Sequence, residues 1–433
     1  MLYDLPMSLV PVPSLVLSFE DARQVVEEHA AKLRPVGTEK LDLLPASGRV
    51  LAEPIHADRD FPPFPRAARD GYAVRASDLL HVPARLEVIA EIKAGAAPED
   101  LPESVESGQA VAIMTGAPAP VGTDAVVMVE YTRRTQDQVE IARAIRAGDN
   151  IVPAGSEARR GDLLLAPGTR LNQAAIAVAA SVGKPQVQVY RKPKVAVLST
   201  GDEVVPIDTH PGPNQIRNSN SYSLAAQILS AGGEPVLLPI APDEPDGLSE
   251  LIRQGLRYEL LLLAGGVSMG KYDLVEEVMA RLQAGFFFTG AQIQPGRPIV
   301  FGVAPASSPA TQGTSLGTDA SNTYFFGLPG NPVSTMVTFN LFVRPMLDAL
   351  TGAIQHRLVF LHARLKTEIR TKTGLKRFLP AILSGEFERA EVELAGWQGS
   401  GDIATTARSN CYIVIPPDRD QIPAGEWVPL LLG

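Results

Sequence analysis

Cysteine is almost absent from this 433-residue chain, in which Cys411 is the only one. One cysteine cannot build an internal disulfide framework, so we expect a protein of a reducing compartment, the cytoplasm. The six histidines never stand at the spacing of metal ligands along the sequence. We therefore expect no zinc site.

Long apolar runs and an excess of positive charge are also missing. The apolar run at 260–263 is far shorter than the roughly 20 residues that cross a bilayer, so we expect no membrane association. The apolar N-terminal stretch lacks a basic start and is broken by Pro6, Pro11 and Pro13, which argues against a secretory signal. The net charge of −9 argues against binding of nucleic acid through a broad basic field.

The residues that are present predict a multidomain α/β protein. Hydrophobic residues make up 45% of the chain and charged residues 20%, which is typical of globular domains with real cores. An amphipathic helix is expected at 18–33, with Ser18 at its start. Between 191 and 352, apolar runs alternate with helical periods, which predicts a mainly parallel sheet.

Four domains are expected. The α/β domain (191–352) carries a low-complexity insertion at 304–322. Short β-like runs between Gly, Pro and Asp clusters predict a small β domain at 61–149 and a C-terminal β domain at 353–433. The segments 18–60 and 150–190 form a discontinuous connecting domain with helical and β elements.

Four loops of the α/β domain share one expected position. They are STGDE (199–203), GGVSMGKYD (265–273), QPGRP (294–298) and GLPGNPVS (327–334). Three of them follow predicted strands, and ligands of open α/β sheets bind where loops leave the carboxyl ends of the strands. We therefore expect these loops to meet around one site.

Each loop by itself has two interpretations. In GLPGNPVS, Asn331 and Pro332 suit the start of a helix, which either binds an anion or only begins the helix. In STGDE, Asp202 and Glu203 either hold Mg²⁺ with a pyrophosphate or form a solvated turn in which Asp202 is a cap.

The other two loops have similar alternatives. The glycines of GGVSMGKYD allow the backbone to approach a ligand closely, and the Ser268 hydroxyl can donate a hydrogen bond to a phosphate. Asp273 either serves the site or only stabilises the first turn of a helix. Arg297 of QPGRP suits an oxyanion, or is an ordinary surface arginine.

Taken together, these loops resemble those of the MoeA family of molybdopterin molybdenumtransferases, to which the gephyrin E domain also belongs. The matching segments run in family order over nearly the whole chain. They are RDGYAV (69–74), IMTGAPAPVGTDAVVMVE (113–130), GDLLLAPGTRL (161–171), the four loops (PGRP within the third) and SGDIATTARSN (400–410).

The resemblance implies an elongated four-domain subunit, a homodimer with a shared active site, and contacts with other proteins of cofactor biosynthesis or apo-molybdoenzymes. It implies Mg²⁺-dependent insertion of molybdate into adenylylated molybdopterin, with release of AMP. Carried over to this chain, the catalytic residues are Asp202, Glu203, Asp273, Asp70 and Thr115, with Asp202 and Glu203 as the Mg²⁺ ligands. The substrate-binding residues are Thr200, Gly201, Asn218, Gly265, Gly266, Ser268, Gly270, Pro295, Gly296, Arg297, Pro298, Pro329, Gly330, Asn331, Pro332, Ser334 and Ser400.

Some positions depart from the family pattern. An acidic residue before DGYA is Pro65 here, one lysine beside the PG pair is Gln294, and an arginine expected near Phe378 is Pro380. Two interpretations follow: an active transferase, or a diverged paralogue that binds the pterin nucleotide or a partner protein without turnover. The extra β domains argue against a third, a single-domain adenylyltransferase.

Overall fold

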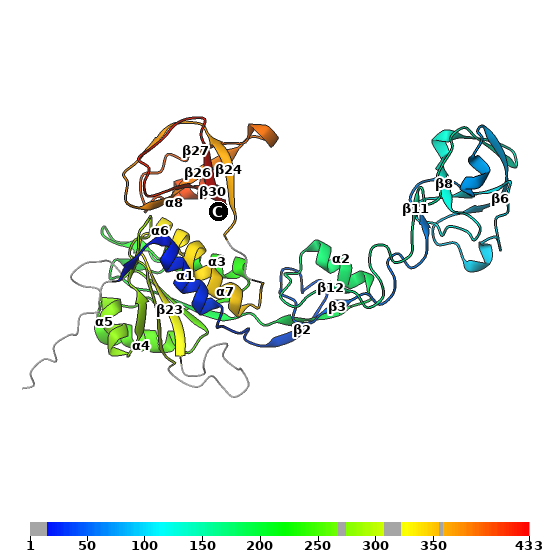
Figure 1. The fold of residues 1–433 in the computed structure, drawn as a ribbon. Coiled ribbons are helices and arrows are strands. Elements are labelled where there is room, and N and C mark those ends of the chain that lie inside the picture. Colours follow the sequence, from blue (N-terminus) through cyan, green and yellow to red (C-terminus); the bar gives the residue numbers. More distant parts are fainter. Residues whose placement is uncertain (1–14, 267–273, 307–321, 355–357, 433) are drawn as a thin grey trace, which may run out of the picture. The chain divides into compact units, whose positions relative to one another are not determined.

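The computed structural model describes residues 15–266, 274–306, 322–354 and 358–432 (Figure 1). Its contacts divide the chain into two compact units. The first unit contains the described residues up to Ala52, the segment Gly168–Leu171 and those from Val187 onward. The second contains Glu53–Pro167 and Asn172–Gln186.

The first unit is built on a six-stranded sheet. Its strands, in spatial order, are β17 (Glu234–Leu237), β14 (Lys194–Ser199), β18 (Leu260–Ala264), β23 (Asn322–Leu328), β22 (Val300–Pro305) and β19 (Gly285–Phe288). The first four are parallel, and the last two continue the sheet by antiparallel pairing. A central parallel strand is buried on both faces, which explains the uninterrupted apolar run of β18.

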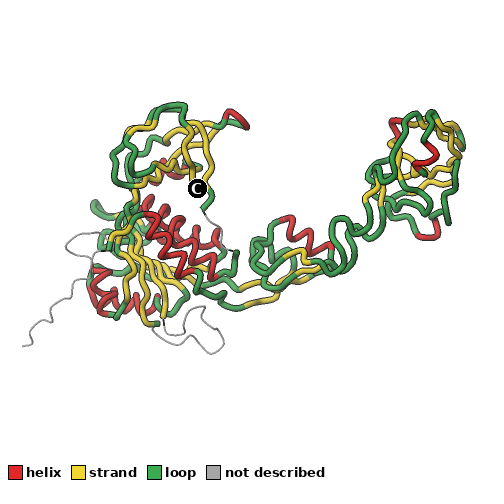
Figure 2. The backbone as a smooth tube through the Cα atoms, in the orientation of Figure 1, coloured by secondary structure: helices red, strands yellow, loops and turns green. Residues whose placement is uncertain are grey.

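Helices cover both faces of this sheet, as Figure 2 shows. One face carries α1 (Phe19–Ala30), α3 (Ser219–Ala231) and a continuous helical stretch of α6 (Pro332–Thr338), a π-helical turn (Phe339–Val343) and α7 (Arg344–Leu350); the other carries α4 (Pro245–Gly255) and α5 (Leu274–Arg281). Side chains alternate along a strand, so Leu260 and Leu262 pack on the first face and Leu261 on the second.

Polar caps fix the ends of several of these helices. The Ser18 hydroxyl accepts the backbone N–H of Asp21 at 3.0 Å at the start of α1. The Asn218 side chain accepts the N–H of Ser221 at 3.1 Å at the start of α3, and Gly232, with φ of +92°, ends that helix. These helices therefore begin and end where their short polar residues and glycine allow.

The C-terminal part of the first unit is a closed β barrel. Its strands are β26 (Lys376–Ser384), β27 (Glu391–Leu394), β24 (Phe360–Leu365), β30 (Trp427–Leu432) and β28 (Cys411–Ile415), and β28 also pairs with β26 to close the ring. A short helix, α8 (Ile403–Arg408), and the ladder of β25 (Ile369–Arg370) and β29 (Gln421–Ile422) complete it. Burial of Cys411 in this core raises the pKa of its thiol to about 11, so it stays a protonated apolar group.

The barrel and the α/β layers share contacts. The short strand β21 (Ile293–Gln294) pairs in parallel with β26. The rings of Phe19 and Phe378 lie 5.4 Å apart, so α1 and the barrel belong to one core.

Short ladders complete the first unit. They pair β1 (Val16–Leu17) with β20 (Gly290–Ala291), β2 (Thr38–Asp42) with β13 (Gln186–Tyr190), and β15 (Val204–Val205) with β16 (Ile216–Arg217).

The second unit contains a six-stranded sheet of its own. In spatial order its strands are β8 (Ala125–Met128), β5 (Gly71–Val74), β7 (Gln109–Ile113), β6 (Ala84–Ile92), β10 (Gln138–Ile141) and β9 (Thr132–Thr135). Two hydrophobic clusters pack on opposite sides of these strands. Two ladders, β3 (Ile55–His56) with β12 (Leu163–Leu165) and β4 (Arg66–Ala67) with β11 (Ile151–Val152), and the helix α2 (Gln173–Ser181) complete the unit.

The expected multidomain α/β architecture, with a mainly parallel sheet and small β domains, is confirmed. The helical stretch from α6 to α7 contains a π-helical turn, and the strand at Gly285–Phe288 was not expected, because a run of three phenylalanines carries no period. The four-domain boundaries and the elongated subunit stay predictions. Among the described residues, no helix is both long and apolar enough to cross a membrane.

Candidate functional site

A cleft of about 980 Å³ lies at the carboxyl ends of the parallel strands in the first unit. Strands β14, β18 and β23 end at Ser199, Ala264 and Leu328, and the loops that follow them line the cleft. The parallel register brings these ends to one edge, as the sequence predicts. The predicted residues that line it are Thr200, Gly201, Glu203, Asn218, Gly265, Gly266, Pro298, Pro329, Gly330, Asn331 and Pro332.

The two glycines after β18 are required by the backbone. Gly265 and Gly266 have φ values of +101° and +65°, in the region that favours glycine. A Cβ on Gly265 would lie 2.8 Å from the carbonyl oxygen of Thr200, and one on Gly266 would lie 2.8 Å from Val275. The loop therefore lies directly against STGDE, and its glycines form a bare backbone wall of the cleft.

The STGDE loop is held by an aspartate that the sequence analysis missed. The Thr200 hydroxyl donates to Oδ1 of Asp243 at 2.7 Å, and the backbone N–H of Asp243 donates to Oδ1 of Asp202 at 3.1 Å. Asp243 follows β17, so it lies after a strand end just as the other loops do. Asp202 lines a neighbouring hollow of about 770 Å³ rather than the cleft.

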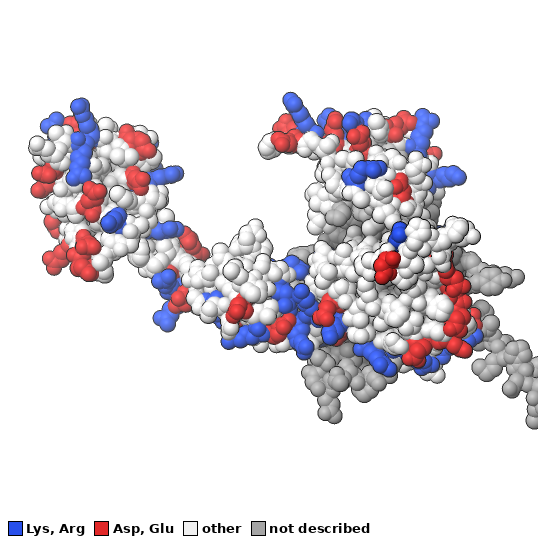
Figure 3. Space-filling model, turned by 180° about the vertical axis from the view of Figure 1, so that it is seen from behind, with Lys and Arg blue, Asp and Glu red and all other residues white. Residues whose placement is uncertain are grey.

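Acidic side chains outnumber basic ones in the lining of the cleft. Glu203, Asp243 and Glu277 are its carboxylates, and Arg217 is its one arginine among the described residues. Arg217 donates to the carbonyl oxygen of Thr209 at 3.1 Å, and Glu277 pairs with Arg281. The lining therefore favours a cation beside whatever anion enters. Elsewhere on the surface, Figure 3 shows acidic and basic side chains interspersed.

The start of α6 forms the opposite wall. Pro332 occupies the first turn as expected, but the Asn331 side chain makes no capping hydrogen bond. The Thr335 hydroxyl contacts the carbonyl oxygens of Pro329 and Asn331 and so fixes the GLPGNP loop. The backbone N–H of Val333 donates to the carbonyl oxygen of Ser400 at 3.1 Å. One donor that would serve an anion at this helix end is thus already satisfied by the barrel.

Further links tie this wall to its surroundings. The Asn220 side chain donates to the carbonyl oxygen of Gly330 at 2.7 Å, which joins the start of α3 to the GLPGNP loop. The barrel contributes Gly401 and Ile403 to the cleft. Gly401 and Ile403 belong to the matching segment SGDIATTARSN, whereas Asn220 carried no local sequence signal of its own.

Several predicted binding residues are not part of the cleft lining. Pro295, Gly296, Arg297, Ser334 and Ser400 are outside the lining that the described residues form. Arg297 is exposed, whereas Ser334 is buried in α6. A Cβ on Gly296 would lie 2.4 Å from Thr338, so this glycine serves packing against α6. Of the QPGRP loop, Pro298 alone reaches the cleft.

Three predicted residues, Ser268, Gly270 and Asp273, lie outside the described residues. Asp70 and Thr115 lie in the second unit. There, Oδ1 of Asp70 accepts the backbone N–H of Thr115 at 2.6 Å and its hydroxyl at 2.8 Å. These hydrogen bonds, the backbone one foremost, lower the pKa of Asp70. Asp70 is therefore a charged acceptor that positions Thr115.

The positions that depart from the family pattern can also be placed. Beside Pro65, the Arg66 guanidinium pairs with Glu157 at 2.8 Å in the second unit. Pro380 lies on the same side of β26 as Phe378, toward the α/β layers. Arg377 extends from the opposite side and contacts Thr371, so it does not replace an arginine at Pro380.

Comparisons with known proteins cover nearly the whole chain. Models of the MoeA N-terminal region (domains I and II), a probable molybdopterin-binding domain and the MoeA C-terminal region (domain IV) match residues 17–183, 196–349 and 362–432.

Similar full-length proteins support the same family. A molybdopterin molybdenumtransferase of Nostoc sp. is 35% identical over 97% of this chain and 94% of its own length. The Bacillus subtilis protein of the same name is 33% identical, covering 91% of this chain and 90% of its own length. The crystal structure of the molybdopterin biosynthesis moeA protein of Pyrococcus horikoshii OT3 matches 96% of this chain and 100% of its own, with a TM-score of 0.75 and 30% identity. This chain belongs to the MoeA family of molybdopterin molybdenumtransferases.

Proposed function

We propose that this protein inserts molybdate into adenylylated molybdopterin and releases AMP during molybdenum cofactor biosynthesis. The observation that carries the proposal is the cleft where STGDE, the Gly265–Gly266 wall and the GLPGNP loop meet. Its volume of about 980 Å³ is at the upper end of sites for small molecules and suits a dinucleotide-sized substrate.

The cleft suits a phosphoanhydride next to a metal ion. Bare backbone at Gly265 and Gly266 allows close approach of phosphate oxygens, as in other glycine-rich phosphate loops. Hydroxyl and amide side chains at Asn218, Ser219 and Asn220 supply donors that need no net charge. These residues bind and orient the substrate rather than exchange protons with it.

Magnesium fits the donor set of the cleft. Among the described residues, no three His, Cys, Asp or Glu side chains gather closely enough to hold a metal by themselves. Mg²⁺ commonly uses one or two carboxylates and completes its coordination with phosphate oxygens and water. Glu203 and Asp243 are the carboxylates that line the cleft beside STGDE and would hold the ion. When bound, Mg²⁺ neutralises charge on the phosphate that leaves.

The roles of the two carboxylates of STGDE differ in this proposal. Glu203 faces the cleft and is the direct ligand. Asp202, whose carboxylate accepts the N–H of Asp243, acts first by holding the loop. Asp70 acts through Thr115, in an arrangement supported by the two hydrogen bonds that it accepts. We also propose a homodimer in the cytoplasm, on the family resemblance alone.

The test is AMP release from adenylylated molybdopterin with Mg²⁺ and molybdate. The full-length protein is expected to release AMP. Glu203→Gln should raise the Mg²⁺ concentration needed for AMP release by at least tenfold. Glu250→Gln, a change at an exposed residue of α4, should behave as the wild type. Nucleotide binding without AMP release would contradict the proposal and support a carrier that binds without turnover. A Glu203→Gln variant with unchanged Mg²⁺ dependence would overturn the metal assignment.

A further inference from the structure

A second, smaller cavity lies at the far ends of the helices that open onto the cleft. It has a volume of about 220 Å³. The start of α3 and the start of α6 line the cleft, whereas Ala231, at the end of α3, and α7 lie beside this cavity. Of the segments that matched the family, only GDLLLAPGTRL contributes to it, through Gly168 and Arg170, and none of the proposed catalytic residues belongs to it.

Arginine dominates the polar lining of the cavity. Arg23 from α1, Arg170 from the segment Gly168–Leu171 and Arg344 from α7 line it, with Asp348 as the single carboxylate among the described lining residues. Asn340 of the π-helical turn adds an amide. Apolar residues make up most of the remaining lining, and where they exclude water they strengthen the field of the guanidinium groups. They are Pro345, Ala353, Ile354, Leu358 and Val359.

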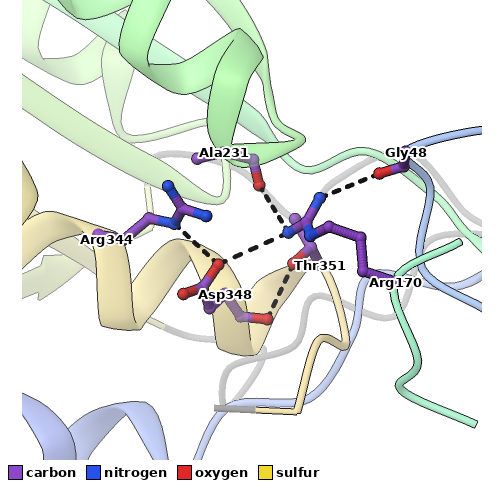
Figure 4. Close-up of polar contacts among 6 residues, drawn as sticks. All are labelled: Gly48, Arg170, Ala231, Arg344, Asp348 and Thr351. Atoms are coloured by element: carbon purple, nitrogen blue, oxygen red, sulfur yellow. Dashed lines mark hydrogen bonds and ion pairs between the residues drawn. The ribbon is translucent and has the colours of Figure 1, made fainter. Parts of the chain in front are cut away.

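Two of the arginines share one carboxylate, as Figure 4 shows. Nε of Arg344 lies 3.0 Å from Oδ1 of Asp348, and Nη2 of Arg170 lies 3.7 Å from the same oxygen. Arg170 also donates to the carbonyl oxygens of Gly48 and Ala231, at 3.0 and 3.3 Å. The trio therefore carries one uncompensated positive charge.

Partial burial raises the cost of that surplus charge, because the side chains of Arg170 and Arg344 are 34% and 38% exposed. Burial lowers the pKa of the Arg170 guanidinium, nearby Asp348 raises it, and Arg344 lowers it. A buried cation is stabilised best when an anion completes its hydrogen bonds. The two Nη groups of Arg344 make no hydrogen bond to a described residue, so they are available for one.

Arg23 adds a further donor to the lining. It is only 9% exposed, its Nε pairs with Glu27 at 2.6 Å, and one Nη contacts the carbonyl oxygen of Leu341. Its other Nη, Nη2, has no hydrogen-bond partner in the described part of the chain, although the side chain lines the cavity. A nearly buried guanidinium with a free N–H group at a cavity is a ready donor to an oxyanion.

We propose that this cavity is a binding site for a small tetrahedral oxyanion of the phosphate, sulfate or molybdate type. The free N–H groups of Arg23 and Arg344 hold its oxygens, and Arg170 contributes charge. The volume of about 220 Å³ accommodates such an ion with a few waters, but not a nucleotide. The site stands apart from the proposed catalytic cleft and does not depend on its activity.

The experiment titrates the full-length protein with inorganic phosphate, sulfate and molybdate at constant ionic strength, by calorimetry and by the shift in melting temperature. Saturable binding is expected, with the three ions in mutual competition. Arg344→Gln and Arg23→Gln should each weaken binding at least tenfold. Arg85→Gln, a surface arginine paired with Glu140 in the second unit, should leave it unchanged.

A further variant separates binding from folding. Asp348→Asn removes the one carboxylate among the described lining residues, so it should tighten binding, whereas damage to the fold would weaken it. Arg217→Gln, which changes the one arginine that the described residues contribute to the cleft lining, should leave phosphate binding intact, which distinguishes this cavity from the cleft. Absence of saturable binding, or binding insensitive to both Arg344→Gln and Arg23→Gln, would overturn the assignment. The assignment would also be overturned if molybdate bound and neither phosphate nor sulfate competed with it.

Discussion

Asp202 and Asp243 hold each other through reciprocal contacts. The backbone N–H of Asp243 donates to Oδ1 of Asp202 at 3.1 Å, and the N–H of Asp202 approaches Oδ2 of Asp243 at 3.4 Å. A hydrogen bond from Thr200 to Asp243 adds a third link. Two loops that follow neighbouring strands, β14 and β17, are thereby fixed together beside the cleft. The sequence suggests that such carboxylates are free to bind a metal, but in the structure both accept hydrogen bonds from backbone N–H groups.

Asp243→Ala is expected to loosen the STGDE loop. The change leaves the Thr200 hydroxyl and the Asp202 N–H without their acceptor and removes a proposed Mg²⁺ ligand, so we expect AMP release at saturating Mg²⁺ to fall by about 10- to 100-fold, the scale of lost positioning. Single-turnover kinetics with adenylylated molybdopterin measure the effect. The control is Glu250→Gln, a change at an exposed residue of α4. A wild-type rate for Asp243→Ala would contradict the positioning role.

Gly265→Ala is expected to destabilise the fold strongly. The positive φ costs about 1–2 kcal/mol for any L-residue, and the contact with the carbonyl oxygen of Thr200 adds about 1–3 kcal/mol of overpacking. Gly108→Ala is the matched control, because Gly108 also has a positive φ, of +85°, but no atom within 4 Å of its Cβ position. Urea unfolding measures both variants. Equal losses of unfolding free energy in the two variants would show that the close contact with the Thr200 carbonyl oxygen contributes nothing at Gly265.

The pKa of Asp70 is expected to rise in Thr115→Val. The variant removes the hydroxyl donor and keeps the backbone donor, which is the larger cause, so the rise should be partial. Because the pKa of Asp70 is lowered in the folded state, its stabilising contribution is present above the ordinary aspartate pKa and is lost as pH falls through the lowered value. Carboxyl-carbon NMR titration measures the shift.

An internal control for that titration is Asp402, whose pKa is lowered by its own hydrogen bonds from Thr405 and Gln398. Its titration should not change in Thr115→Val. An unchanged pKa of Asp70 in the same variant would show that the hydroxyl does not stabilise the carboxylate.

Ser18→Ala is expected to lower the free energy of unfolding by about 1 kcal/mol, because the variant loses the capping bond at the start of α1. Asn331→Ala at the start of α6 should cost less than about 0.5 kcal/mol, because no side-chain capping bond is present there. Thermal and urea unfolding of both variants test the difference. A larger loss for Asn331→Ala than for Ser18→Ala would reverse this order.

Local patterns were enough to predict several elements. The apolar run at 260–263 marked a buried parallel strand, and Ser18 stands at the start of α1 as predicted. Loops that follow parallel strands must meet at one edge of a sheet, so the meeting of STGDE, Gly265–Gly266 and GLPGNP around one cleft could be predicted before its geometry was known. Helix caps, the alternation of side chains along a strand and strand direction depend on residues that are neighbours in the sequence, so they can be predicted from the sequence alone.

Contacts between distant segments could not be predicted in this way. The contact of Val333 with Ser400, the pairing of Asp202 with Asp243, and the three arginines around one small cavity join residues that are far apart in the sequence. Their side chains have the same local patterns as ordinary surface residues. Only tertiary packing decides which polar groups lose water, and a polar group that loses water must find a partner or remain available for a ligand.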